Sequence, residues 1–263
     1  MPKESSSPGT RPLRVAIATS FDPIVVLPRL SALCTALKEA LGRPTSGHLM
    51  ISYEELERGA EADEFQLMWL PPLVALSLVP SGAATALAVP VRAGQTSYAT
   101  ALFTRPDSDI RSLEDLKGKV VAWVDLQSSA GYVLPRALLR SRGLDPDTLF
   151  REERRCGSHE GVVAAVLDGA ADVGATYVHL EDGQIVDAAW GDREVRVLAS
   201  YGPIPADILA SGRSLPDALV EDLRDAIQSD DSAIAEASRL LLECDGFVTP
   251  EPSHLEALRA LVS

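Results

Sequence analysis

Two adjacent serines at a strand–helix junction are the stretch of this chain best suited to bind a ligand. Ser128 and Ser129 follow an apolar run over residues 120–124 that is typical of a buried strand, and Gly131 precedes a helical pattern. Hydroxyl donors, backbone N–H groups at a helix start and a glycine that permits close approach would suit a small oxyanion. On this stretch alone, a serine that simply caps the helix is the simpler interpretation.

A second helix start in the sequence carries similar chemistry. Gly157 and Ser158 precede a helical pattern, and His159 falls in its first turn. A histidine at this place can donate to an anion or can lie on the solvated surface. Taken alone, the surface position is the simpler interpretation. Two helix starts of this kind in one part of the chain favour an arrangement in which both contact the same ligand.

Three aromatic residues lie at or near the ends of expected strands. Trp69 nearly closes the run "FQLMWL", Tyr98 begins a strand, and Tyr177 nearly ends one. Such rings most often pack in the core or at its rim, but at the carboxyl end of a parallel strand they can wall a pocket.

Enzyme motifs are absent from the sequence. There is no GxSxG elbow, no phosphate-binding P-loop, no GxGxxG and no HExxH. Ser128, His159 and Asp207 can be imagined as a catalytic triad, but nothing in their spacing supports one. We therefore expect a protein that is not an enzyme.

Composition and charge exclude several classes of partner. The chain has 263 residues, a formal net charge of -14 and 46% hydrophobic residues. Its acidity disfavours binding to nucleic acid or an anionic membrane, although backbone N–H groups and hydroxyls can still hold an anion. The three cysteines are odd in number and widely separated, which fits neither a disulfide framework nor a zinc site. No metal and no cofactor are predicted.

The first twenty residues, "MPKESSSPGTRPLRVAIATS", lack the basic start and apolar core of a secretory signal. Residues 1–11 are expected to form a disordered lead-in. No run is long and apolar enough to span a membrane, since the best one is broken by Pro71 and Pro72. On the sequence as it stands we expect a cytoplasmic protein, or a periplasmic or extracellular one if the true start lies upstream.

Strand and helix patterns alternate along the chain. This alternation predicts an α/β fold with mostly parallel sheets. The alternation restarts near Ser97, which suggests two lobes. We expect the first lobe to contain residues 12–98 and 201–263, and the second lobe to contain residues 99–200.

Several blocks of the sequence together resemble one known family. They are "QLMWLPPLVALSL", "AVPVRAGQTSYATALFTRPDSDIRSLEDLKGKVVAWVDLQSSAGYVLPRALLRSRGLDP", "CGSHEGVVAAVLDGAADVGATY" and "YGPIPADILA". From about Val15 to the C-terminus, their order is similar to that of the phosphonate-binding proteins of ABC importers, within the phosphate, phosphite and phosphonate group. The resemblance implies a two-lobed periplasmic binding protein-like type II fold, with two crossover strands and the ligand in the cleft.

The resemblance also implies a set of ligand-binding residues. The family's Ser-Thr-Ser-Gly-Tyr junction, whose three hydroxyls and nearby amides hold the phosphonate, corresponds to Ser128, Ser129, Ala130, Gly131 and Tyr132, so that Ala130 lacks a hydroxyl. The other matching positions are Trp69, Tyr98, His159, Tyr177 and Asp207.

Two of these matches concern an amine on the ligand. Asp207 matches an acidic position that faces the ligand amine in aminophosphonate binders. After Tyr177 the family often has acidic residues, whereas this chain has Val178 and His179, with Glu181 and Asp182 displaced. This departure argues against an amine-bearing ligand.

The leading hypothesis is a solute-binding protein for a small oxyanion of the phosphonate or phosphate type, serving ABC-type uptake. It would be a monomer that meets an ABC permease and neither binds nucleic acid nor inserts into a membrane. The alternative is a cytoplasmic enzyme or a ligand sensor built on the same fold. A third option is a binding domain that feeds a regulator or kinase.

Overall fold

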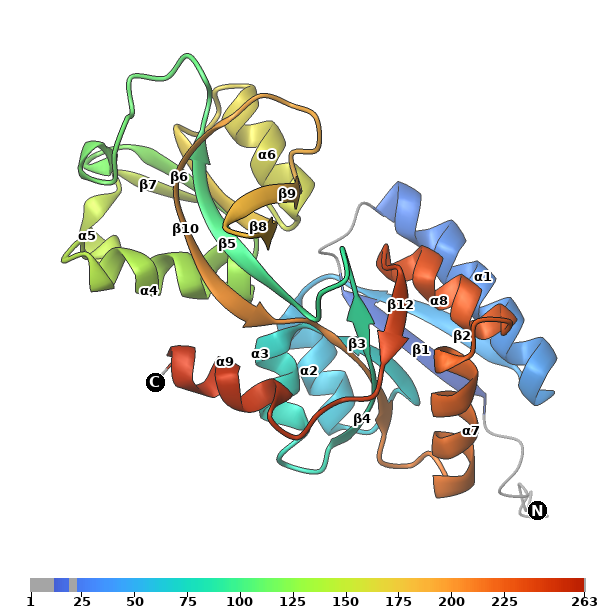
Figure 1. Ribbon diagram of the computed structural model, residues 1–263. Coiled ribbons are helices and arrows are strands. Elements are labelled where there is room, and N and C mark those ends of the chain that lie inside the picture. Colours follow the sequence, from blue (N-terminus) through green and yellow to red (C-terminus); the bar gives the residue numbers. More distant parts are fainter. Residues whose placement is uncertain (1–11, 19–22, 263) are drawn as a thin grey trace, which may run out of the picture.

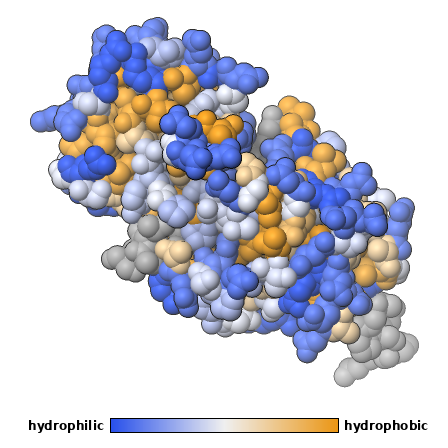
Figure 2. Space-filling view, viewed as in Figure 1, coloured by the Kyte–Doolittle hydropathy of each residue, from blue (hydrophilic) through white to orange (hydrophobic). Residues whose placement is uncertain are grey.

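The computed structural model describes residues 12–18 and 23–262, which form two α/β lobes around two separate sheets (Figure 1). The first sheet draws strands from both ends of the chain, and the second draws them from the middle. The lead-in expected over residues 1–11 lies outside the described residues. In Figure 2 hydrophilic residues cover most of the visible face, with apolar patches on each lobe.

The sheet of the first lobe has the strand order β12-β4-β11-β3-β1-β2. Its strands are β1 (Leu13–Ala18), β2 (Thr45–Met50), β3 (Leu67–Leu70), β4 (Ala84–Val91), β11 (Ile208–Gly212) and β12 (Gly246–Val248). β1 pairs in parallel with β2 and β3, whereas β11 runs antiparallel between β3 and β4. Every residue of β3 is buried, because both faces of this central strand are covered.

Helices from both ends of the chain pack on this sheet. They are α1 (Pro23–Leu41), α2 (Tyr53–Glu61), α3 (Pro72–Leu78), α7 (Asp217–Gln228) and α8 (Ala233–Leu242), whereas α9 (His254–Val262) lies against α3 and against the second lobe. α1 buries Val26, Leu30, Leu33 and Leu37, whose spacing places them on one face of a helix. α2 begins after Ser52, whose side chain accepts a hydrogen bond from the Glu55 backbone N–H.

The sheet of the second lobe has the strand order β10-β5-β8-β6-β7, and β9 pairs with β8. Its strands are β5 (Ser97–Thr104), β6 (Val120–Trp123), β7 (Glu152–Arg155), β8 (Val173–Glu181), β9 (Gln184–Ala188) and β10 (Arg196–Pro205). Its helical elements are the 3₁₀ turn η1 (Glu114–Leu116), the π-helical turn η2 (Ser129–Val133), α4 (Leu134–Ser141), α5 (Pro146–Leu149) and α6 (His159–Leu167).

Two crossing segments join the lobes. The chain passes from β4 to β5 through residues 92–96 and returns from β10 to β11 through residues 206–207. The segments are tied together, since the Ala206 backbone N–H donates to the Thr96 carbonyl at 2.9 Å. Because β5 and β10 pair along their length, Tyr98 and residues 201–205 belong to the second sheet, whereas the predicted boundaries assigned them to the first lobe.

The prediction of a two-lobed α/β fold with two crossovers is confirmed, but the sheets are mixed rather than mostly parallel. β1, β2 and β3 are mutually parallel, as are β6, β7 and β8. The strands next to the crossings run antiparallel, because a chain that leaves one lobe and comes back must reverse direction beside the strand on which it left. Strand–helix alternation reveals the parallel units but not the returning strands.

Each lobe has its own apolar core. The larger core packs the first sheet against its helices, and the second sheet buries apolar side chains on both faces. The cysteines Cys34, Cys156 and Cys244 are free, and burial raises the pKa of Cys34 to about 11. Within residues 12–18 and 23–262, no helix combines the length and the apolar character needed to cross a bilayer.

Candidate functional site

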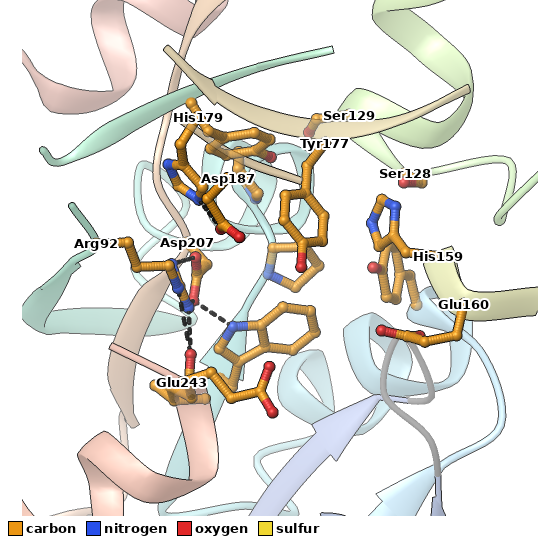
Figure 3. A pocket seen from close by; sticks show the side chains of 16 residues that line it. Arg92, Ser128, Ser129, His159, Glu160, Tyr177, His179, Asp187, Asp207 and Glu243 are labelled. Carbon is orange, nitrogen blue, oxygen red and sulfur yellow. Dashed lines mark hydrogen bonds and ion pairs between the residues drawn. The ribbon is translucent and has the colours of Figure 1, made fainter. Parts of the chain in front are cut away.

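A cavity of about 360 Å³ is lined by side chains from both lobes (Figure 3). Its lining residues are Tyr53, Trp69, Pro71, Pro72, Arg92, Tyr98, Ser128, Ser129, His159, Glu160, Tyr177, His179, Asp187, Asp207, Leu242 and Glu243. The predicted ligand-binding residues among them are Trp69, Tyr98, Ser128, Ser129, His159, Tyr177 and Asp207. Trp69 and Asp207, which lie 138 positions apart in the sequence, are thus brought together.

The two serines have different roles at the end of β6. Ser128 caps the π-helical turn, because its side chain accepts from the Gly131 backbone N–H at 3.1 Å. Ser129 is equally buried, yet its Oγ has no hydrogen-bond partner among the described residues. A buried polar atom without a partner is costly, so Ser129 Oγ is the atom of this turn with spare capacity for a ligand. The helix-cap interpretation therefore fits Ser128, and the ligand interpretation fits Ser129.

The rest of the predicted anion loop faces away from the cavity. Ala130 packs against Leu134 and Ile204, and its carbonyl accepts from Thr100 Oγ1 at 2.7 Å. Gly131 must be glycine, because a Cβ there would lie 2.3 Å from a methyl group of Val124.

Tyr132 also lies outside the cavity. Its ring meets that of Trp123 edge-on at 5.7 Å, and the Arg136 guanidinium lies 4.8 Å from it. Ala130, Gly131 and Tyr132 thus shape and support the loop, and none of the three is among the residues that line the cavity.

His159 begins α6 and presents a neutral imidazole to the cavity. Its Nδ1 lies 2.7 Å from Thr176 Oγ1, and its ring packs edge-on against Tyr177 at 5.0 Å. Burial lowers the pKa of His159 to about 4, so the ring carries no charge near neutral pH. Ser158 caps the helix by accepting from the Gly161 N–H, which leaves His159 in the first turn.

Tyr98 and Tyr177 add phenol groups on the side of the second lobe. Burial raises the pKa of both, so both hydroxyls stay protonated and can donate. For Tyr177, the charges of Asp187, Glu160 and Glu243 raise the pKa further. The Tyr98 hydroxyl lies near Ser129, whose hydroxyl opposes the effect of burial on its pKa, although the two do not form a well-aligned hydrogen bond.

Asp207, on the second crossing, forms an ion pair with Arg92 on the first. Arg92 donates to both carboxylate oxygens, at 2.7 and 3.2 Å, and Trp69 Nε1 donates to Oδ2 at 2.5 Å. Burial alone would raise the pKa of Asp207, but Arg92 and Trp69 hold it below its usual value. Arg92 also donates to the Leu242 carbonyl at the end of α8. The carboxylate that was predicted to face a ligand amine is therefore already paired.

Three further carboxylates line the cavity: Glu160, Asp187 and Glu243. Glu243 pairs with Arg29 at 2.5 Å, and Asp187 Oδ2 lies 4.0 Å from His179 Nε2. Because the Arg92 charge is balanced by Asp207, the lining holds no uncompensated cation in the part of the chain that the structure describes. Any anion in this cavity would therefore have to be bound by uncharged hydrogen-bond donors.

The interpretation of the sequence missed Arg92, His179 and the three further carboxylates of the lining. Arg92 had a local signal, since it is a single guanidinium that directly follows an apolar strand. His179 also had a local signal, because residues two apart on a strand share a face and Tyr177 was already a predicted ligand-binding residue. The residues Glu160, Asp187 and Glu243 are exposed in part or lie in turns, and nothing in their spacing marks them.

The geometry gives no support to a catalytic triad. Ser128 Oγ accepts from Gly131, His159 Nδ1 faces Thr176, and Asp207 is held by Arg92 and Trp69. Each of the three residues is thus engaged elsewhere. Among the described residues, no group of His, Cys, Asp and Glu side chains is arranged to hold a metal ion.

Comparison with known proteins gives the same architecture. Residues 15–255 match the family described as the periplasmic substrate-binding protein of phosphonate ABC transporters. The structure of PhnD1 from Prochlorococcus marinus, in complex with methylphosphonate, superposes with a TM-score of 0.79 at 15% identity over 97% of both chains. A binding protein component of an ABC phosphonate transporter from Pseudomonas aeruginosa gives a TM-score of 0.81 at 20% identity, over 96% of this chain and 85% of that one. XAC2383 from Xanthomonas citri, bound to chloride, gives a TM-score of 0.72 at 22% identity over 95% and 96%.

Proposed function

Since the chain belongs to the family of periplasmic substrate-binding proteins of phosphonate ABC transporters, we propose that its cavity binds a small oxyanion of the phosphonate or phosphate type. The observation that carries the proposal is the Ser129 hydroxyl. It is buried in the cavity lining and has no partner among the described residues, so a ligand oxygen would satisfy it. PhnD1, the relative of like fold, was solved with methylphosphonate, which is such an anion.

The donors around Ser129 suit an anion without the help of a free cation. Tyr98 keeps its proton, and His159 Nε2 makes no hydrogen bond within the described residues. A hydrogen bond to a charged ligand typically contributes roughly 1.5–3 kcal/mol, so a few neutral donors suffice for useful affinity. Ala130 points into apolar packing, so its missing hydroxyl removes no group from this cavity.

A ligand panel tests this function directly. We expect methylphosphonate, phosphite or phosphate to raise the melting temperature, because a ligand that binds only the folded chain stabilises it by mass action. Ser129→Leu would fill the space beside the hydroxyl and abolish the shift. Ser31→Leu, at an exposed position on α1, is the matched control and should keep it. Absence of any shift across the panel in the wild-type chain would overturn the proposal.

The family implies a transport role with a permease as partner. We infer that the chain works outside the cytoplasmic membrane and delivers its ligand to an ABC permease. Fractionation of cells that express the natural gene, followed by detection with an antibody, tests the location. Recovery in the cytoplasm would instead favour a sensor or an enzyme on the same fold.

A further inference from the structure

One hydrogen bond joins the two lobes directly beside the Ser128–Ser129 turn. Gln127 Nε2, in the second lobe, donates to Glu57 Oε2 of α2, in the first lobe, at 2.7 Å. The acceptor is a carboxylate, which makes this bond stronger than one between neutral groups. We propose that this bond is a latch that sets the position of the anion-binding turn against the facing wall of the cavity. The proposal rests on the proposed function, because it assigns positioning residues to the same site.

The loop that carries Gln127 is stiff, so a constraint on Gln127 reaches the serines. The Gln127 backbone N–H donates to Asp125 Oδ1 at 2.9 Å, and the Ser128 N–H donates to the Asp125 carbonyl at 2.9 Å. The Val124 N–H donates to the Gly131 carbonyl at 3.2 Å, which closes the loop from the other side. These bonds connect consecutive residues into one rigid turn. Moving Gln127 therefore moves Ser128 and Ser129 with it.

On the other side of the latch, Glu57 belongs to the helix that carries part of the cavity wall. Tyr53 lies one helical turn before Glu57, on the same face of α2. The Tyr53 ring packs edge-on against Trp69 at 5.8 Å, and both line the cavity. The latch thus connects the turn with the buried serines to the helix that supports the aromatic wall. Neither Glu57 nor Gln127 lines the cavity, so both act as positioning residues.

The sign of the change in anion affinity when Glu57 is removed distinguishes the latch from a simple effect of its charge. Removing a carboxylate near an anion site should strengthen anion binding if charge alone matters. If the latch holds the binding-competent arrangement, its removal should weaken binding, because apparent affinity falls with the fraction of competent molecules. The two explanations predict opposite signs for Glu57→Ala.

The first measurement is the affinity of Glu57→Ala for methylphosphonate and for inorganic phosphate by titration calorimetry. We expect binding about tenfold weaker than in the wild type, since most molecules would no longer hold the competent arrangement. Glu54→Ala is the matched control, because it removes the same charge from an exposed position on the same helix. Binding by Glu57→Ala that is unchanged or tighter than in the wild type would overturn the latch.

The second measurement is the spacing of the lobes, taken without any ligand. Spin-labelled amino acids at the exposed positions Lys38 and Arg142 report it by pulsed electron resonance. Gln127→Glu places two carboxylates opposite each other and should broaden the distance distribution. The swap of Glu57→Gln with Gln127→Glu rebuilds the bond with donor and acceptor exchanged and should narrow it again.

The spacing measurement also separates the latch from the proposed function. A wild-type chain that binds neither probe would refute the function, whereas the spacing of the variants would still decide the latch. A distribution that stays the same in Gln127→Glu, or that the swap fails to narrow, refutes the latch even when both probes bind. Broadening that the swap reverses supports it.

Discussion

The two walls of the cavity use polar residues in opposite ways. On the side of the second lobe, Ser129, Tyr98 and His159 are neutral groups with hydrogen-bonding capacity to spare. On the opposite side, the charged groups Arg92 and Asp207 satisfy each other, together with Trp69 and the end of α8. The Arg92–Asp207 ion pair of this site therefore serves the architecture, and the uncharged groups of Ser129, Tyr98 and His159 are available to a ligand.

This contrast shows that a buried charge in a cavity lining need not take part in ligand binding. A buried ion pair whose donors and acceptors are all used contributes little to ligand binding, whatever its formal charge. A buried hydroxyl without a partner is destabilising until a ligand completes it. The numbers of charged and neutral groups in a lining are therefore poor guides to ligand class unless their bonds are also known.

The largest expected effect comes from breaking the ion pair. Arg92→Met leaves the Asp207 carboxylate buried without its cation, which typically costs about 3–5 kcal/mol of unfolding free energy. Urea denaturation measures this loss of unfolding free energy. Arg58→Ala, which removes an exposed partner 4.0 Å from Glu54, is the control and should cost less than about 1 kcal/mol. Similar losses in the two variants would show that the Arg92–Asp207 pair is not the structural element described above.

The next effect is a dependence of stability on pH from His159. Its pKa is about 4 in the folded chain and 6.5 in the reference state, so the unfolded chain binds more protons between these values. Stability should then fall as pH drops from about 6.5 to about 4, with a slope from this residue of at most about 1.4 kcal/mol per pH unit. His159→Gln should remove that part of the slope in denaturation curves recorded across this window. An unchanged slope would mean that the imidazole is not held neutral by burial.

The smallest effect compares the two serines. Ser128→Ala removes a cap and should lower stability by about 1 kcal/mol. Ser129→Ala removes a hydroxyl that has no partner, so its stability should equal or slightly exceed that of the wild type. Thermal unfolding of both variants measures the difference. A larger loss in Ser129→Ala than in Ser128→Ala would reverse the roles assigned to the two hydroxyls.

The sequence alone located the serine turn and His159, because both stand at helix starts that local patterns reveal. It could not separate Ser128 from Ser129, since which hydroxyl caps the turn depends on the π-helical geometry of residues 129–133. For the same reason it placed Tyr132 in the site, although that ring packs on Trp123. Local pattern shows where a turn lies, but it does not show which side chains of the turn face a cavity.

Asp207 shows the other limit of the sequence. The resemblance implied that Asp207 faces a ligand amine. In the structure its carboxylate pairs instead with Arg92, which lies 115 positions away on the other crossing segment. The latch between Glu57 and Gln127 spans 70 positions in the same way.

The sequence by itself indicated the two lobes and the helix starts that carry the donors, because these follow from hydrophobic periodicity and local capping, whereas the crossovers were implied by the resemblance to a known family. Only the tertiary structure decided which polar groups are satisfied and which remain available to a ligand. The physical reason is that a polar group is satisfied only by a hydrogen-bond partner, and the crossings bring together partners that lie far apart in the sequence. The sequence of one segment does not specify its distance from another.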